Sequence, residues 1–144
     1  MREILFRGRN SDGCWVEGSY HYQNGEMLKD GTKKLEHRIL GLRGECIYVV
    51  PETVGQYTGL TDKNGKKIFE GDIVATKYKL GRGGYYVFEV YYNENLCQFA
   101  LTINSGSYTK NGQYDWLQLT SLKANKVEVI GNIHDTPELL KEDK

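Results

Sequence analysis

The sequence lacks the features that point to several common classes of protein. Lys+Arg and Asp+Glu both number 19 in its 144 residues, and the balance also holds within halves, with 11 of each sign in residues 1–72 and 8 in residues 73–144. Overall charge therefore gives no attraction toward nucleic acid or an anionic membrane. No apolar run reaches the ~20 residues that cross a bilayer, and Met1 is followed by "REILFRGR" instead of the apolar core of a signal peptide. These absences predict a soluble cytoplasmic protein.

Cysteine and histidine are too few and too scattered to indicate a metal site. The three cysteines form an odd set without a C-x-x-C pair, which fits reduced thiols better than a disulfide framework. A structural zinc site would have to be assembled entirely from long-range contacts. We expect no metal and no cofactor. Small buried thiols and surface imidazoles are the expectation for Cys14, Cys46, Cys97, His21, His37 and His134.

Glycine and tyrosine are abundant and proline is scarce. The chain has 17 Gly, 11 Tyr and only 2 Pro, with short runs in which β-branched and aromatic residues alternate with polar ones. This pattern predicts antiparallel strands. Dipeptides that allow positive φ predict two-residue hairpin turns. These candidates are Asp12-Gly13, Asn24-Gly25, Asp30-Gly31, Asn64-Gly65 and Asn111-Gly112.

The predicted fold is mostly β (α+β), a single domain over residues 1–144. A chain of this size buries roughly 68–70% of its unfolded surface, so it needs no disulfide or metal to fold. We expect an antiparallel meander that closes into a small barrel-like core. Its strands are predicted at residues 3–9, 14–20, 45–50, 56–60, 66–69, 73–79, 85–92, 98–103, 114–119 and 126–133. The side chains predicted to share the core are Tyr86, Phe88, Val90, Val127, Val129 and Ile133.

Helix is expected only in short pieces. Thr136 is suited to cap a first turn, Pro137 fits the first helical position and Glu138 lies at the positive end of the helix dipole. These three residues together predict a short C-terminal helix. For residues 32–41 two interpretations stay open, because Leu35 and Ile39 recur at helical spacing while "HRIL" also suits a strand.

Several ordered motifs resemble one known family. "MREILFRGR", "GQYTGLTDKNGKKIFEGDIV" and "VEVIGNIHDTPELL" are similar to the opening, central and closing motifs of the YopX family of phage and prophage proteins, with "DGCWVEGSY" and "PETV" between them. Together these segments cover roughly half the chain. The resemblance implies a small protein made in the bacterial cytoplasm from a bacteriophage or prophage gene. It implies no chemistry, because the family brings no catalytic residues to carry over.

The regular stretch from residue 54 to residue 74 is interpreted as turn and strand chemistry. Solvated charges around a tight turn are the first interpretation of Asp62, Lys63, Lys66 and Lys67, with phosphate binding as the alternative. A phosphate cradle is followed by a helix, whereas this turn leads into a strand pattern. Glu70 and Asp72 could be an acid and base pair, but no histidine or nucleophile is near in sequence. A Gly71 turn whose backbone N–H groups bond to Asp72 is favoured.

One candidate binding site remains, around the "GRGG" loop at residues 81–84. The loop lacks G-x-G-x-x-G spacing and is interpreted as a hairpin loop. Basic residues interleaved with aromatic ones can follow a single-stranded backbone while bases stack on the rings. The residues of this tentative nucleic-acid contact are Lys77, Lys79, Arg82, Tyr78, Tyr85 and Tyr86. Trp15 and Trp116 are interpreted as core or interface anchors, with ligand stacking as the alternative.

Three classes of function remain after these considerations. The first is a non-enzymatic phage accessory protein that acts through protein contacts, as a homo-oligomer whose exposed strands and Tyr-rich faces are covered by neighbours and with an unknown phage or host protein as partner. The second is a small nucleic-acid-binding module. An enzyme comes last, because the sequence holds no nucleophile elbow, metal-ligand set or phosphate loop. The sequence favours the first class.

Overall fold

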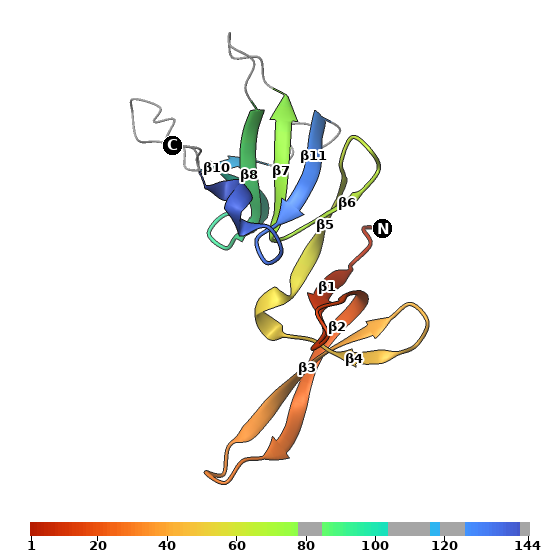
Figure 1. Cartoon of the computed structure of the whole chain (residues 1–144). Coiled ribbons are helices and arrows are strands. Elements are labelled where there is room, and N and C mark those ends of the chain that lie inside the picture. The colour runs from red at the N-terminus through yellow and green to blue at the C-terminus, as the bar shows by residue number, and fades with distance from the viewer. Residues whose placement is uncertain (78–84, 104–115, 119–125, 142–144) are drawn as a thin grey trace. The chain divides into compact units, whose positions relative to one another are not determined.

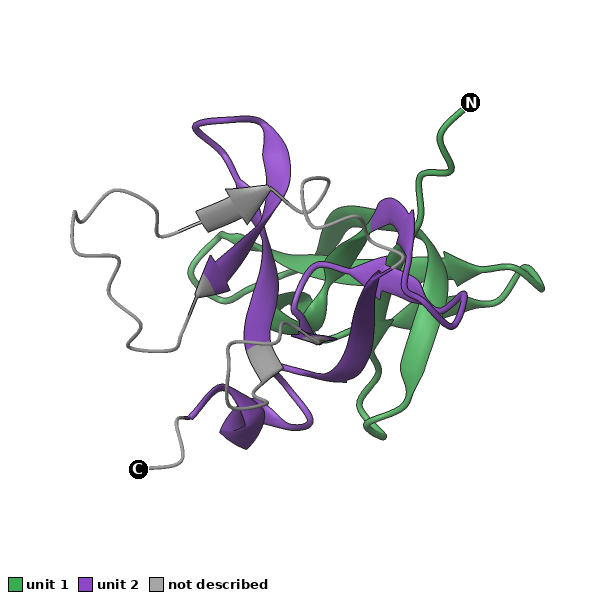
Figure 2. Cartoon of the chain, turned by 90° about the horizontal axis from the view of Figure 1, so that it is seen from above, with its two compact units in different colours: residues 1–57 green, residues 58–144 purple. Residues whose placement is uncertain are grey.

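The chain forms two compact units built almost entirely of strands. A computed structural model describes residues 1–77, 85–103, 116–118 and 126–141. Residues 1–57 form one unit and residues 58–144 the other (Figure 2). The boundary falls inside one strand, so the polypeptide passes from one unit to the next without a linker. No helix of the described residues is long and apolar enough to span a membrane.

In chain order the elements are β1 (Phe6–Arg9), β2 (Trp15–Met27), β3 (Lys33–Gly41), β4 (Cys46–Tyr48), η1 (Pro51–Thr53), β5 (Gly55–Thr61), β6 (Lys67–Phe69), β7 (Asp72–Lys77), β8 (Tyr85–Asn93), β9 (Gln98–Ile103), β10 (Trp116–Gln118), β11 (Val127–Asn132) and η3 (Pro137–Leu140). Most neighbouring strands are consecutive in the chain, as in a meander, but β1 also pairs with β5 and β7 with β11 (Figure 1).

The mostly β, antiparallel prediction is confirmed, but the barrel-like closure is wrong. Strands pair in the orders β4-β3-β2-β1-β5-β6 and β10-β9-β8-β7-β11. Within the described residues neither sheet pairs its first strand with its last, so each remains open. Closure requires strand number, tilt and register to be mutually consistent. Local alternation predicts each strand but carries no information about whether the outermost strands meet.

The unit formed by residues 1–57 depends on close approach of strands at two glycines. Buried Ile39 and Val49 face Gly8, where an added Cβ would lie 3.1 Å from Val49 Cβ and 3.3 Å from Ile39 Cδ1. At Gly18 an added Cβ would lie 2.0 Å from the carbonyl oxygen of Leu40. A side chain there is excluded by backbone, so the close approach of β2 to β3 requires glycine.

The unit formed by residues 58–144 contains the main hydrophobic core. Its central cluster is apolar and almost completely shielded from solvent, and it consists of Ile68, Val74, Phe88, Val90, Leu101 and Val127. The predicted core positions Phe88, Val90 and Val127 belong to it, and Val129 packs against it. Ile133 is half-buried. The Tyr86 side chain lies outside what the structure describes.

The hairpin turns occur at most of the predicted places but have a different geometry. In each, the N–H of the fourth residue bonds to the C=O of the first, and the N–H of the first bonds to the C=O of the fifth. Positive φ occurs at the glycine and not at the preceding Asp or Asn. This is a type I turn with a glycine bulge, not the predicted two-residue turn. It is found at three predicted places, residues 10–14, 28–32 and 62–66, and also at residues 41–45, where no turn was predicted and Arg43 precedes the glycine.

One predicted turn is wrong, and another lies outside the described residues. Asn24-Gly25 lies inside β2, where the register with β3 shifts between Asn24 and Met27, so this dipeptide forms a bulge. The chain reverses instead at Asp30-Gly31, where Gly31 has a φ of 83°. Asn111-Gly112 falls in the undescribed range. The Gly71 turn is confirmed, with a φ of 82°.

Of the two expected helices, one exists as a single short turn. η3 is a 3₁₀ helix with Pro137 in its first turn, as predicted. Thr136 makes no capping bond to it, because its hydroxyl is turned back to the N–H and C=O of Asn132, both at 3.2 Å. Residues 32–41 are not helical. Lys33–Gly41 is strand β3, because pairing with β2 overrides the helical spacing of its apolar residues.

Candidate interaction surface on the β2–β3 arm

The longest hairpin of the first unit extends beyond the strands that flank it (Figure 1). β1 pairs with β2 only over Trp15–Gly18, and β4 pairs with β3 over Arg38–Leu40. Beyond these pairings, and a bond from the N–H of Val49 to the C=O of His37, β2 and β3 pair only with each other in the part of the chain that the structure describes. We call residues 19–37 the arm. A two-stranded ribbon alone is marginally stable in water, so an arm of this kind suits contact with a partner.

One face of the arm is an aromatic row. Register places Tyr20 opposite Ile39 and Tyr22 opposite His37, so these side chains share a face. The Tyr20 and His37 rings stack with centroids 6.0 Å apart at 17°, and the Tyr22 and His37 centroids lie 6.3 Å apart. Phe6 on β1 continues the row, 5.5 Å from Tyr20. The row therefore runs from the body of the unit onto the arm.

A hydrogen bond holds the aromatic row in place. The Tyr20 hydroxyl and His37 Nδ1 are 2.6 Å apart. Partial burial, and secondarily the neighbouring Tyr22, raises the pKa of Tyr20. Its hydroxyl therefore stays protonated at neutral pH while it is hydrogen-bonded to His37 Nδ1. The Tyr22 side chain is packed less tightly than that of Tyr20, since 64% of its surface is exposed.

The opposite face of the arm is polar. Arg38 Nη2 lies 2.6 Å from Glu36 Oε2, donates to the Tyr48 hydroxyl, and its guanidinium carbon lies 4.2 Å from the Tyr48 ring centroid. Gln23 donates to the same Glu36 oxygen at 3.2 Å. The bond from Arg38, and then that from Gln23, lowers the pKa of Glu36. The charged groups of Arg38 and Glu36 on this face are therefore already paired within the chain.

The cysteines and Trp15 differ in part from what the sequence predicts. All three cysteines are exposed, not buried, and Cys46 Sγ lies 3.8 Å from His21 Nε2. Trp15 is half-buried and stacks under Arg7, whose guanidinium carbon lies 4.7 Å from the ring centroid, with that of Arg9 at 5.9 Å. Cation–π stacking thus occupies Trp15 on the sheet surface.

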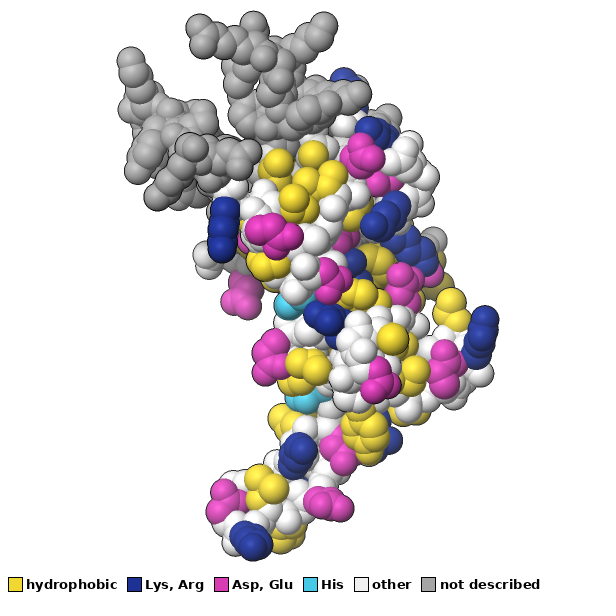
Figure 3. All heavy atoms as spheres, viewed as in Figure 1, with side chains coloured by type: hydrophobic (Ala, Val, Ile, Leu, Met, Phe, Trp, Pro, Cys, Tyr) yellow, Lys and Arg dark blue, Asp and Glu magenta, His cyan; other side chains and the backbone are white. Residues whose placement is uncertain are grey.

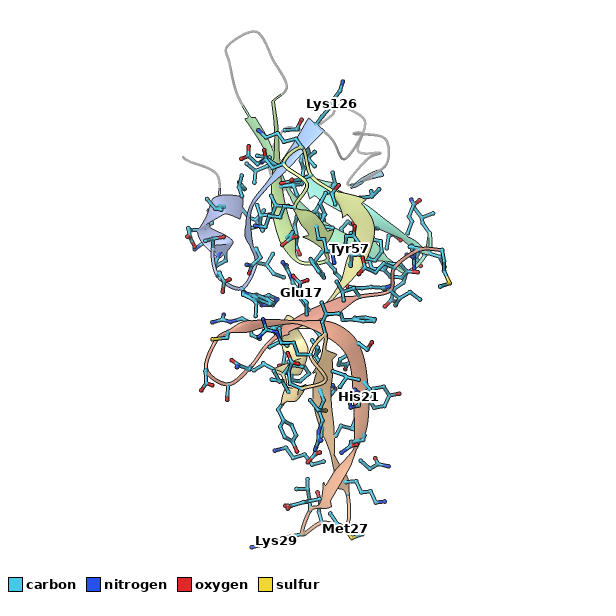
Figure 4. The ribbon with its side chains drawn as sticks, turned by 90° about the vertical axis from the view of Figure 1, so that its right-hand side faces the viewer. Glu17, His21, Met27, Lys29, Tyr57 and Lys126 are labelled. Carbon is cyan, nitrogen blue, oxygen red and sulfur yellow. The ribbon has the colours of Figure 1, made fainter. Side chains whose placement is uncertain are left out.

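The end of the arm exposes apolar side chains. Exposed fractions are 68% for Met27, 46% for Leu28 and 48% for Leu35. Figure 3 shows hydrophobic side chains among charged ones along the arm, and Figure 4 places Met27 and Lys29 at its tip. Aromatic, methionine and leucine side chains on a projecting element are typical of a protein-contact surface.

The sequence predicted a different site, which the structure describes only in part. Tyr78, Lys79 and Arg82 lie outside the described residues. The antiparallel register pairs Lys77 with Tyr85 and Thr76 with Tyr86 at the ends of β7 and β8. The strands therefore bring Lys77 and Tyr85 together as backbone positions. Trp116 is placed on β10, paired with Thr102.

The carboxylates of the central stretch hold turns together. Asp62 is 4% exposed and accepts bonds from the N–H groups of Asn64, Lys66 and Val129 at 2.8, 2.9 and 3.0 Å. Asp72 is 1% exposed and its Oδ2 accepts the N–H of Phe69 at 2.7 Å. These contacts support the turn interpretation of residues 54–74.

The arm could not be recognised from the sequence, because its two strongest local patterns are typical of other structures. Asn24-Gly25 is typical of a turn, and Leu35 and Ile39 are spaced as in a helix. The alternation in "GSYHYQNG" with Asp30-Gly31 beyond it was the available signal for a long hairpin.

The fold and this surface define a small, mostly β protein with a projecting hairpin. A family model described as YopX protein matches residues 5–141, and the chain belongs to this family. The crystal structure of protein EF1440 from Enterococcus faecalis is similar, with 25% identity and a TM-score of 0.52. The match covers 98% of this chain and all of that one. No curated protein matches the chain.

Proposed function

We propose that this protein is a non-enzymatic phage or prophage accessory protein that acts by binding other protein chains in the bacterial cytoplasm. The observation that carries the proposal is the arm, a ribbon longer than its flanking strands with exposed apolar side chains at its end. Apolar side chains held out on a projecting element are costly in water unless a partner covers them. Membership of the YopX family supports a phage or prophage origin.

The non-enzymatic part of the proposal rests on how the conspicuous polar residues are used. Asp62 accepts three backbone hydrogen bonds, and Asp72 accepts the N–H of Phe69. Glu36 is engaged by Arg38 and Gln23. Carboxylates held in this way stabilise turns and sheet faces and are poorly placed to exchange protons with a substrate.

The alternative is a nucleic-acid-binding module that uses the hairpin between β7 and β8. The observation that favours it is the register, which pairs Lys77 with Tyr85 and so keeps a basic and an aromatic position side by side. Lys79, Arg82, Tyr78 and Tyr86 would complete the contact. Zero net charge argues against a dominant phosphate interaction.

A comparative pull-down from infected or lysogenic cells tests the proposal. The bait is the tagged full chain, and captured proteins are identified with and without nuclease treatment. Met27→Glu places a charge at the tip of the arm, while Leu42→Glu is the matched control, since Leu42 is 84% exposed on the turn between β3 and β4. We expect nuclease-resistant partners that wild type and Leu42→Glu retain and Met27→Glu loses. Equal capture by all three baits, or capture only without nuclease, would overturn the proposal.

A further inference from the structure

The outer edge of β2 carries backbone groups that pair with no other strand among the described residues. The N–H of Val49 bonds to the C=O of His37, so the backbone groups of His37 are directed toward β4 and not toward β2. Tyr22 lies opposite His37 and therefore directs its own N–H and C=O to the outer edge of β2. By the same alternation Tyr20 and Asn24 do so as well.

This edge lacks the protection that exposed edges normally carry. Charged side chains, lysine above all, keep edge strands from pairing with other chains. Between Glu17 and Glu26 strand β2 has no Lys, Arg, Asp or Glu, although 26% of the chain is charged. The other edge of the arm is protected, because β3 begins with Lys33 and Lys34. The β2 edge of the arm therefore lacks the charged side chains that the β3 edge carries.

We propose that the β2 edge from Tyr20 to Asn24 pairs antiparallel with the same edge of a second copy of this chain, centred on Tyr22. The inference rests on the proposed function and names one of its partners. A two-fold axis at Tyr22 joins the two arms into a four-stranded sheet in the order β3-β2-β2′-β3′. The arm then gains the strand neighbours that an isolated hairpin lacks.

The second copy is favoured because the edge is complementary to itself. Around the axis Tyr22 meets its counterpart, Tyr20 meets Asn24, and His21 meets Gln23. No like charges are opposed, and the central Tyr22 pair is aromatic with aromatic, which stabilises a sheet. The aromatic rows of the two copies also join on one face, since Tyr22 is the most exposed ring of the row.

The bulge at the end of the arm limits the pairing to this segment. Register with β3 shifts between Asn24 and Met27, and an added Cβ at Gly25 would lie 2.6 Å from Glu36 Cγ. A bulge bends the strand and ends a ladder. The paired segment therefore stops before Met27, and the tip remains available for the other partners of the proposed function.

Sedimentation equilibrium of the full chain from 1 to 200 µM, with two matched variants, tests the pairing. Tyr22→Lys opposes two like charges at the axis, whereas Leu35→Lys adds the same charge on the same face at the other edge. We expect dimers for wild type and Leu35→Lys, and at least a tenfold weaker association for Tyr22→Lys. Circular dichroism confirms that each variant is folded. A monomeric wild type, or equal association of all three proteins, would overturn the inference.

A cross-link gives a second, positive measurement. Cα atoms of a hydrogen-bonded antiparallel pair lie ~5.5 Å apart, within the range of a disulfide. With Cys14, Cys46 and Cys97 replaced by Ser, Tyr22→Cys should form a covalent dimer on mild oxidation and Leu35→Cys should not. Dimers from both or from neither contradict the proposed register. Capture of host proteins by Tyr22→Lys but not Met27→Glu would show that the proposed function stands even where the pairing fails.

Discussion

The carboxylate of Asp62 accepts a hydrogen bond at 3.0 Å from the backbone N–H of Val129, a residue 67 positions further along the chain. The same carboxylate closes its own turn through Asn64 and Lys66. Beside it the N–H of Lys63 bonds to the C=O of Val127, and Lys63 Nζ lies 2.5 Å from Glu128 Oε2. Asp62 thus joins the β5–β6 hairpin to β11, within the second unit.

Replacement of Asp62 by Asn should destabilise the protein. The Asn amide nitrogen cannot accept the bond that one carboxylate oxygen takes, so a partly buried N–H loses its partner, at a cost of about 2–3 kcal/mol of unfolding free energy. Urea denaturation at pH 7 measures this loss. Lys63→Met, which removes only the half-exposed ion pair with Glu128, is the control and should cost less than about 1 kcal/mol. Equal effects would mean that the backbone bonds of Asp62 contribute little.

The difference between wild type and Asp62→Asn should depend on pH. Burial raises the pKa of Asp62, but the N–H groups of Val129, Lys66 and Asn64 outweigh it and lower the pKa overall. A lowered folded pKa contributes stability above the unfolded value of about 3.9, and this is lost as pH falls through the folded pKa. The gap in unfolding free energy should therefore be constant from pH 7 to 5 and narrow below pH 4. A gap unchanged at pH 3 would contradict the carboxylate's role.

Gly18→Ala should be much more destabilising than Gly31→Ala. An added Cβ at Gly18 meets the Leu40 carbonyl oxygen at 2.0 Å, which backbone cannot easily relieve. At Gly31 the space is open and only the φ of 83° is unfavourable, so about 1–2 kcal/mol is expected there. Thermal unfolding of the two variants gives the comparison. If Gly18→Ala unfolds no earlier than Gly31→Ala, the close approach of β2 to β3 at Gly18 is wrong.

Tyr20→Phe should cost about 1 kcal/mol of unfolding free energy, because it removes the 2.6 Å bond to His37 while it keeps the stacked ring. Tyr22→Phe is the control on the same face, and its hydroxyl is expected to contribute little to the fold of the isolated chain. Chemical denaturation at a protein concentration at which sedimentation shows only monomer separates the two effects. Similar losses for both variants would argue against the Tyr20–His37 bond.

Binding to generic single-stranded DNA and RNA should be weak or undetectable near 150 mM salt. Lys77, Lys79 and Arg82 offer about three phosphate contacts, and each contributes a log–log salt slope near −0.7 for single strands. Replacement of all three by Ser should leave self-association unchanged. Fluorescence anisotropy with labelled oligonucleotides measures binding. Submicromolar affinity that this triple substitution abolishes would favour the nucleic-acid alternative.

Much of the strand content could be predicted from the sequence, and so could most turn positions. Alternation around Phe88 and Val90 predicted both as core residues, since period two directs alternate side chains to one face of a strand. Asp12-Gly13 and Asn64-Gly65 predicted reversals, and Gly13 and Gly65 have the positive φ that only glycine takes easily. The tight turn at Gly71 was predicted in the same way, from the local sequence. These features depend on neighbours within a few positions.

The interaction surface could not be predicted, because it depends on which strands end early. The pairing of β1 ends at Gly18 of β2 and that of β4 at Arg38 of β3, which leaves the arm without a further paired strand in the described chain. No local pattern specifies where a strand loses its partner. The helical spacing of Leu35 and Ile39 was overridden for the same reason, since pairing with β2 decides the conformation there.

The sequence by itself determined that this chain is built of strands, where most of them turn, and that it resembles the YopX family. Alternation, turn glycines and ordered motifs are local properties, and they need no knowledge of the fold. Only the tertiary structure decided that Asp62 reaches Val129 and that, within the described residues, the sheets stay open and Tyr22 lies on an unprotected edge. Each of these depends on contacts between residues far apart in the chain, whose free energies no short segment contains.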